Sequence, residues 1–134
     1  MFTITSDPAR GLIQATLAGF FDVEGFQRYA AEAEALIRRT IARRGAYSIL
    51  LDVSECAIQS QEVVAAFQRH VASVPRAKRC AVVTGDSIIR MQVRRMMRGP
   101  TMRACADRVS ALEWLRREET APEPTQVKAA CGRT

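Results

Sequence analysis

The feature that most limits how this chain can fold is an apolar run in the middle of the sequence, Tyr47-Ser-Ile-Leu-Leu-Asp-Val-Ser54. A continuous apolar stretch of this length with helical patterns on both sides is typical of a strand buried on both faces in a parallel sheet. Ligands and partners of open α/β sheets bind at the carboxyl ends of such strands. We therefore expect functional residues between Asp52 and Ser60.

The segments before this run predict a hairpin and a helix. Apolar and polar residues alternate over 2–6 and 12–17, with turn residues between them, which favours an antiparallel hairpin. Apolar residues then recur every three or four positions over 23–43, between a capping residue, Asp22, and a terminating glycine, Gly45. This pattern predicts a long amphipathic helix.

The segments after the run alternate between helix and strand. Ser60 is a suitable N-cap for a helix ending at Pro75, and we expect a strand at 78–84, a helix at 88–98 and a strand at 101–106. A last helix, capped by Asp107 or Ser110, should be anchored by Val109, Leu112, Trp114 and Leu115. The order predicts an α/β fold, a mixed sheet with an N-terminal antiparallel hairpin followed by βαβαβα units.

Length and composition favour one cytoplasmic domain without a cofactor. Residues 1–117 should form the domain and 118–134, with two prolines and few large apolar residues, a mobile C-terminal tail. The four cysteines lack metal-ligand spacing and only one histidine, His70, accompanies them, so we expect buried thiols and no metal. No signal-peptide pattern or long apolar span is present, which predicts a cytoplasmic location.

The order of the elements, together with three local sequences, resembles the STAS fold and, more narrowly, the SpoIIAA-like (STAS/SEC14-like) bacterial proteins. The three sequences are Asp52-Val-Ser54, Ala81-Val-Val-Thr-Gly85 and Ala111-Leu-Glu-Trp-Leu115, and the similarity covers about Phe2 to Arg117. The resemblance implies a small module that works by binding. Anti-sigma-factor antagonists of this fold bind a kinase and are switched by phosphorylation at the helix after the central strand, and other relatives bind small ligands or lipids there.

This chain departs from those antagonists at the switch itself. They carry an Asp-Ser-Ser/Thr-Gly-Leu signature, whereas the corresponding stretch here is Ser60-Gln-Glu-Val-Val64. Ser60 takes the place of the aspartate and Gln61 that of the first serine, so the target serine and the glycine are both absent. The resemblance therefore does not predict the familiar phosphoswitch here.

Two interpretations stay open for the polar residues that follow the central strand. Ser60 stands where free N–H groups of a helix start could hold a phosphate or another anion, but a plain N-cap explains it better. Asp52 and Ser54 either line a ligand crevice or cap the turn backbone, and the residue types favour neither. The candidate binding residues in this stretch are Asp52, Ser54, Gln59, Ser60 and Gln61.

Positive charge gathers on the helix expected at 88–98. The stretch from Arg76 to Arg103 has eight basic residues and one acid, a net charge of +7 against +6 for the whole chain. Four of these are candidate binding residues: Arg90, Arg94 and Arg98 form one row at helical spacing, with Arg95 beside it. If Ile88 and Met91 are exposed beside them, the helix suits an acidic partner or an anionic membrane. The simpler alternative is a solvated basic face partly neutralised by Glu62, Glu113 or the acids of the first helix.

Other chemistry is poorly supported. His70 has no partner arranged for catalysis and is expected to make one hydrogen bond at the edge of the core, so we predict no enzymatic activity. The basic region lacks aromatic residues, which disfavours nucleic acid. We therefore expect a non-enzymatic binding or regulatory module for a protein partner or small anionic ligand. Peripheral binding of lipid or anionic membrane is the alternative, and the hairpin edge leaves a homodimer open.

Overall fold

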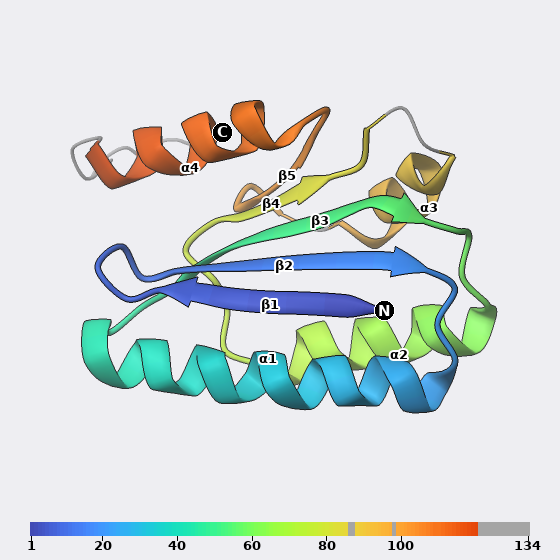
Figure 1. The fold of residues 1–134 in the computed structure, drawn as a ribbon. Coiled ribbons are helices and arrows are strands. Elements are labelled where there is room, and N and C mark those ends of the chain that lie inside the picture. Colours follow the sequence, from blue (N-terminus) through green and yellow to red (C-terminus); the bar gives the residue numbers. More distant parts are fainter. Residues whose placement is uncertain (86–87, 98, 121–134) are drawn as a thin grey trace.

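The computed structural model describes residues 1–85, 88–97 and 99–120, with side chains through Arg117. A five-stranded sheet has the order β1-β2-β3-β4-β5, with β1 antiparallel to β2 and the other neighbours parallel (Figure 1). The predicted mixed α/β fold is therefore confirmed. The elements are β1 (Phe2–Asp7), β2 (Leu12–Gly19), α1 (Val23–Arg44), β3 (Ser48–Cys56), α2 (Gln61–Ser73), β4 (Cys80–Val83), α3 (Ile89–Met96), β5 (Met102–Cys105) and α4 (Arg108–Thr120).

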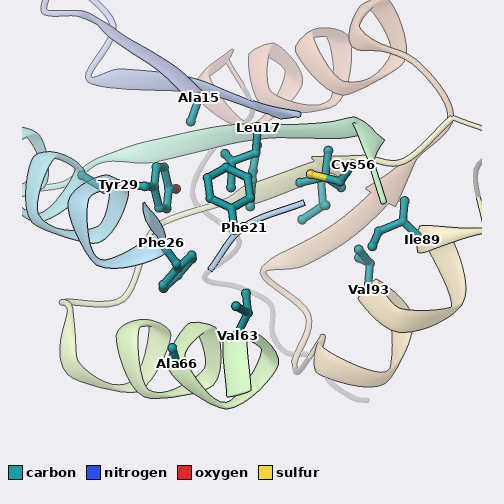
Figure 2. Close-up of a cluster of buried hydrophobic side chains, with 14 residues drawn as sticks. Ala15, Leu17, Phe21, Phe26, Tyr29, Cys56, Val63, Ala66, Ile89 and Val93 are labelled. Carbon is teal, nitrogen blue, oxygen red and sulfur yellow. The ribbon is translucent and has the colours of Figure 1, made fainter. Parts of the chain in front are cut away.

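The central strand β3 is buried on both faces, as its apolar run predicts. Leu51 and Val53 contribute to a cluster shared with α1, α2 and α3, whereas Leu50 belongs to a cluster beneath α4. Figure 1 shows the same division, with α1 and α2 on one side of the sheet and α4 on the other. The first cluster brings Phe26 and Tyr29 of α1 next to the apolar face of α2 (Figure 2).

Helix α1 has the ends that its sequence predicts. The carboxylate of Asp22 accepts a hydrogen bond from the backbone N–H of Gly25 at 2.6 Å, which satisfies one free donor of the first turn. At the other end Gly45 adopts a left-handed conformation with φ of 82°, and its N–H donates to the carbonyl of Ile41. A residue with a Cβ would be strained there, so glycine suits this helix end.

The structure corrects several details at the C-terminal half. The strands β4 and β5 are each four residues long and so shorter than expected. Helix α4 is described to Thr120, and the rest of the expected tail, 121–134, lies outside the described residues. Asp107 caps α4, because its carboxylate accepts from the N–H of Ser110 at 2.8 Å. The prediction that Val109 anchors α4 is wrong, since 67% of that residue is exposed. Among the described residues, none of the helices has the length and apolar character needed to span a bilayer.

Candidate functional site

Asp52 and Ser54 lie close together in a polar cluster on the α4 side of the sheet. The carboxylate of Asp52 accepts hydrogen bonds from both the backbone N–H and the hydroxyl of Ser54, at 3.0 and 2.7 Å. Its other oxygen accepts from the guanidinium of Arg108 at 3.0 Å, and Arg108 also donates to the amide oxygen of Gln14. Asp52 thus has protein partners on both oxygens and bonds the backbone beyond it, as the capping interpretation requires.

The charge of Asp52 is stabilised by these contacts. Burial of the carboxyl group would by itself raise its pKa, but the hydrogen bonds from Ser54 and Arg108 outweigh burial and hold the pKa of Asp52 below the ordinary aspartate value. The carboxylate is therefore ionised at neutral pH and paired with Arg108. Arg108 is not predictable as part of this cluster from the sequence, because its partners are 56 and 94 residues away along the chain.

Gln59 connects three segments that converge at the carboxyl end of β3. Its amide oxygen accepts from the backbone N–H of Phe21 at 2.9 Å, and its amide nitrogen donates to the carbonyls of Gly19 and Ala57. Its backbone N–H and carbonyl bond the side-chain amide of Gln92 on α3. Gln59 therefore holds the β2–α1 turn, the β3–α2 turn and α3 together, and its side-chain amide is occupied by this task.

Ser60 and Gln61 follow with different environments. The hydroxyl of Ser60 accepts from the backbone N–H of Val63 at 3.2 Å, so this serine is the N-cap of α2. Gln61 is exposed at the first position of that helix. Of the two, Gln61 is the more exposed.

Helix α3 lies near the carboxyl end of β3 (Figure 1). Arg90, Arg94 and Arg95 are exposed, while Ile89 and Val93 are buried against the sheet. The position of Arg98 lies outside the described residues. Neither Glu62 nor Glu113 forms a salt bridge within the described part of the chain, so these acids do not neutralise the row by direct pairing.

Four large apolar side chains are exposed in the segments that Gln59 connects. Ile88 is 66% and Met91 62% exposed on the α3 side, and two residues not predicted from the sequence join them, Phe20 at 62% and Ile58 at 49%. Phe20 and Ile58 adjoin the backbone groups that Gln59 bonds, and Met91 adjoins Gln92. We call the set Phe20, Ile58, Ile88, Met91, Arg90 and Arg94 the apolar–basic surface. The adjacent phenylalanines after Gly19 are a signal that could have indicated Phe20, since only Phe21 fits the core.

A second feature is a partly open cavity of about 500 Å³ between the sheet and α2, extending to α3. Its walls are mostly apolar side chains of α1, α2, α3, β3 and β4, including Leu51, Val63, Phe67, Val82 and Val93. His70 is half-buried on this wall, with its ring 6.0 Å from that of Phe26 and 5.9 Å from that of Tyr29. The expected hydrogen bond of the His70 side chain is not found within the described residues.

Two tyrosines on the same wall differ in whether their hydroxyl groups have partners. Tyr47 donates its hydroxyl to the carbonyl of Pro75, whereas Tyr29, only 2% exposed, has no hydrogen-bond partner for its hydroxyl among residues 1–85, 88–97 and 99–120. Burial raises the pKa of both phenols, to about 12 for Tyr47, so both are neutral donors.

The two tyrosines predict opposite effects of the same substitution. Tyr29→Phe removes an unpaired buried hydroxyl and should raise the free energy of unfolding by about 0.5–1 kcal/mol, whereas Tyr47→Phe removes a made hydrogen bond and should lower it by about 1 kcal/mol. Equilibrium unfolding in urea, followed by the fluorescence of Trp114, measures both. A loss of stability in Tyr29→Phe as large as in Tyr47→Phe would show that the Tyr29 hydroxyl has a partner.

Comparison with known proteins places the fold. No protein-family model and no curated protein matches the sequence. Among solved structures, the unphosphorylated anti-sigma factor antagonist SpoIIAA is similar, with a TM-score of 0.57 and 18% identity over 87% of this chain and 98% of that one. An uncharacterised DUF3478-family protein with a SpoIIAA-like fold from Shewanella loihica PV-4 gives a TM-score of 0.63 and 16% identity over 86% and 92% of the two chains. The chain therefore has the STAS/SpoIIAA-like fold.

Proposed function

We propose that this chain is a non-enzymatic regulatory module that binds an acidic protein partner through the apolar–basic surface. The observation that carries the proposal is the exposure of four large apolar side chains beside a basic helix at the carboxyl end of the central strand. Exposed apolar residues gathered in this way mark interaction sites more often than isolated ones do. The resemblance to SpoIIAA, an anti-sigma factor antagonist, supports a regulatory role exerted through protein contact.

The residues of the apolar–basic surface have different roles in binding. Phe20, Ile58 and Met91 supply apolar area at the centre, where most binding energy is found in protein interfaces. Arg90 and Arg94 attract an acidic partner and set the association rate. Gln61 contacts the partner at the edge of this surface, and Arg95 and Arg98 add to the positive charge that attracts it. Gln59 and Ser60 stabilise the β3–α2 turn through their hydrogen bonds. Asp52, which is bonded to Ser54 and Arg108, stabilises the end of β3 and does not contact the partner directly.

The proposal is tested by capture of partners from the lysate of the native host with matched charge variants. Arg90→Gln/Arg94→Gln removes two charges from the surface, and Arg39→Gln/Arg43→Gln removes two exposed charges from α1. We expect the first variant to recover about tenfold less of a specific protein than the second, because steering by complementary charge changes association by this order or more. Equal recovery by both variants would place the partner elsewhere on the molecule.

A peripheral role at an anionic membrane is the second candidate, because apolar side chains beside arginines also suit a lipid surface. Sedimentation with vesicles of phosphatidylcholine alone and with added phosphatidylglycerol separates the two functions. A protein-binding module should sediment equally little with both kinds of vesicle. Salt-sensitive sedimentation with the anionic vesicles only, lost in Arg90→Gln/Arg94→Gln, would favour the membrane instead. If the protein instead binds a small anionic ligand near Ser60, it should sediment with neither kind of vesicle, and the ligand should raise the temperature of thermal unfolding.

A further inference from the structure

The cavity beneath α2 has the size and lining of a small-molecule site. Pockets that bind drug-sized ligands enclose about 300–1,000 Å³, are mainly apolar, and carry a few polar groups that orient the ligand. The cavity here measures about 500 Å³, is partly open, and is lined mainly by apolar residues. It lies between the sheet and α2 and reaches Gln59 and Gln92, but none of the six residues of the apolar–basic surface lines it.

Tyr29 supplies a polar group with no other task. Its side chain is almost completely buried, and Figure 2 shows its hydroxyl pointing from α1 into the layer between the sheet and α2. Buried donors in proteins nearly always have an acceptor, and one without a partner is an exception that calls for an explanation. Within the described residues this hydroxyl has none, whereas an acceptor atom of a bound molecule would complete it.

The surrounding groups select against a charged ligand. Burial lowers the pKa of His70, although Glu34 opposes the shift, and burial raises the pKa of Cys80 to about 12, so both groups are neutral at pH 7. Arg76 is the one cation among the lining residues that the structure describes, and it is exposed. A charged group deep in such an apolar space would lose its hydration without a partner.

We propose that this cavity binds an uncharged, largely apolar small molecule that carries one hydrogen-bond acceptor, such as a ketone or ester oxygen, and that Tyr29 donates to it. The apolar body of the molecule contacts Leu51, Phe67 and Val82, and its oxygen sets its orientation. The proposal does not depend on the function assigned to the apolar–basic surface.

The test uses two neutral fluorescent probes that differ in the acceptor. Prodan is a naphthalene with a ketone, and 2-dimethylaminonaphthalene lacks that ketone. The wild-type protein should bind both saturably, with a blue shift of prodan emission as the probe leaves water. Tyr29→Phe should weaken prodan binding about three- to tenfold and leave the ketone-free probe unchanged, because only one hydrogen bond is removed. Absence of saturable binding in the wild type, or equal prodan affinity in wild type and Tyr29→Phe, would overturn the proposal.

Two further variants locate the probes. Val82→Phe, which fills the cavity from the sheet, should abolish binding of both probes, and far-ultraviolet circular dichroism shows whether this variant folds. If it does not fold, the comparison of wild type with Tyr29→Phe still decides. Phe20→Ser/Met91→Ser removes exposed apolar residues and should leave both affinities as they are. Loss of binding in that variant instead would show that the probes occupy the surface, and the proposal would fall.

Discussion

Replacing Gln59 by alanine should lower the free energy of unfolding by about 2–3 kcal/mol, the largest effect that we expect from any single polar side chain in the described part of the chain. The substitution removes three hydrogen bonds made by the side-chain amide and leaves the buried N–H of Phe21 without an acceptor. An unsatisfied buried donor costs about 1–3 kcal/mol, and the two bonds to exposed carbonyls add less because water replaces them.

Gln61 provides the matched control for this experiment. It is the same residue type two positions away, it is exposed, and no hydrogen bond of its side chain is found within the described residues. Gln61→Ala should change stability by no more than about 0.5 kcal/mol, as is usual for surface substitutions. Urea unfolding of both variants gives the comparison, and similar losses in the two would show that Gln59 does not hold the three segments together.

The second large effect concerns Arg108. Arg108→Met keeps much of the apolar stem but leaves the carboxylate of Asp52, which is 8% exposed, without its cationic partner. We expect a loss of about 2 kcal/mol at pH 7, less than for a fully buried pair because the side chain of Arg108 is 41% exposed and water partly replaces it. Arg39→Gln on the exposed face of α1 serves as the control and should cost little.

The effect of Arg108→Met should depend on pH in a direction set by Asp52. The pKa of Asp52 is lower in the folded protein than in the unfolded chain, where the pKa of aspartate is about 3.9. Ionised Asp52 therefore stabilises the wild type above that pH, and this contribution is lost as the pH falls through the folded-state pKa. The urea midpoints of wild type and variant should converge as the pH falls below about 3.9. A difference that stays constant over this range would mean that packing of the arginine stem, and not its charge, stabilises the fold.

The pattern of apolar residues was sufficient to predict the order and type of the elements. The run at 47–54 predicted a strand buried on both faces, and the spacing at 23–43 predicted α1 to within one residue at its C-terminal end. Such predictions succeed because strand alternation, helical periodicity and caps depend on residues no more than four positions apart. Where the pattern was weak, as at Val109 in the first turn of α4, the predicted burial was wrong.

The candidate site was predictable only in outline. The basic row on α3 follows from the sequence of that helix. The sequence also predicted that α3 would present a mixed apolar and basic surface if Ile88 and Met91 were exposed, and both are exposed. The residues that complete the surface come from other segments, because Phe20 reaches it through the bonds of Gln59 to the β2–α1 turn. Gln59 itself was predicted as a binding residue, and only its partners 33 to 40 residues away show that its side chain has a structural role.

The sequence alone therefore determined the α/β architecture, the two-faced central strand, the caps of α1 and α2, and the concentration of positive charge on α3. The tertiary structure decided which polar side chains are occupied, which apolar ones remain exposed, and that Tyr29 faces a cavity without a partner. The division has a physical cause. Local conformation depends on neighbours along the chain, whereas the partner of a side chain depends on which distant segments the packed sheet brings beside it.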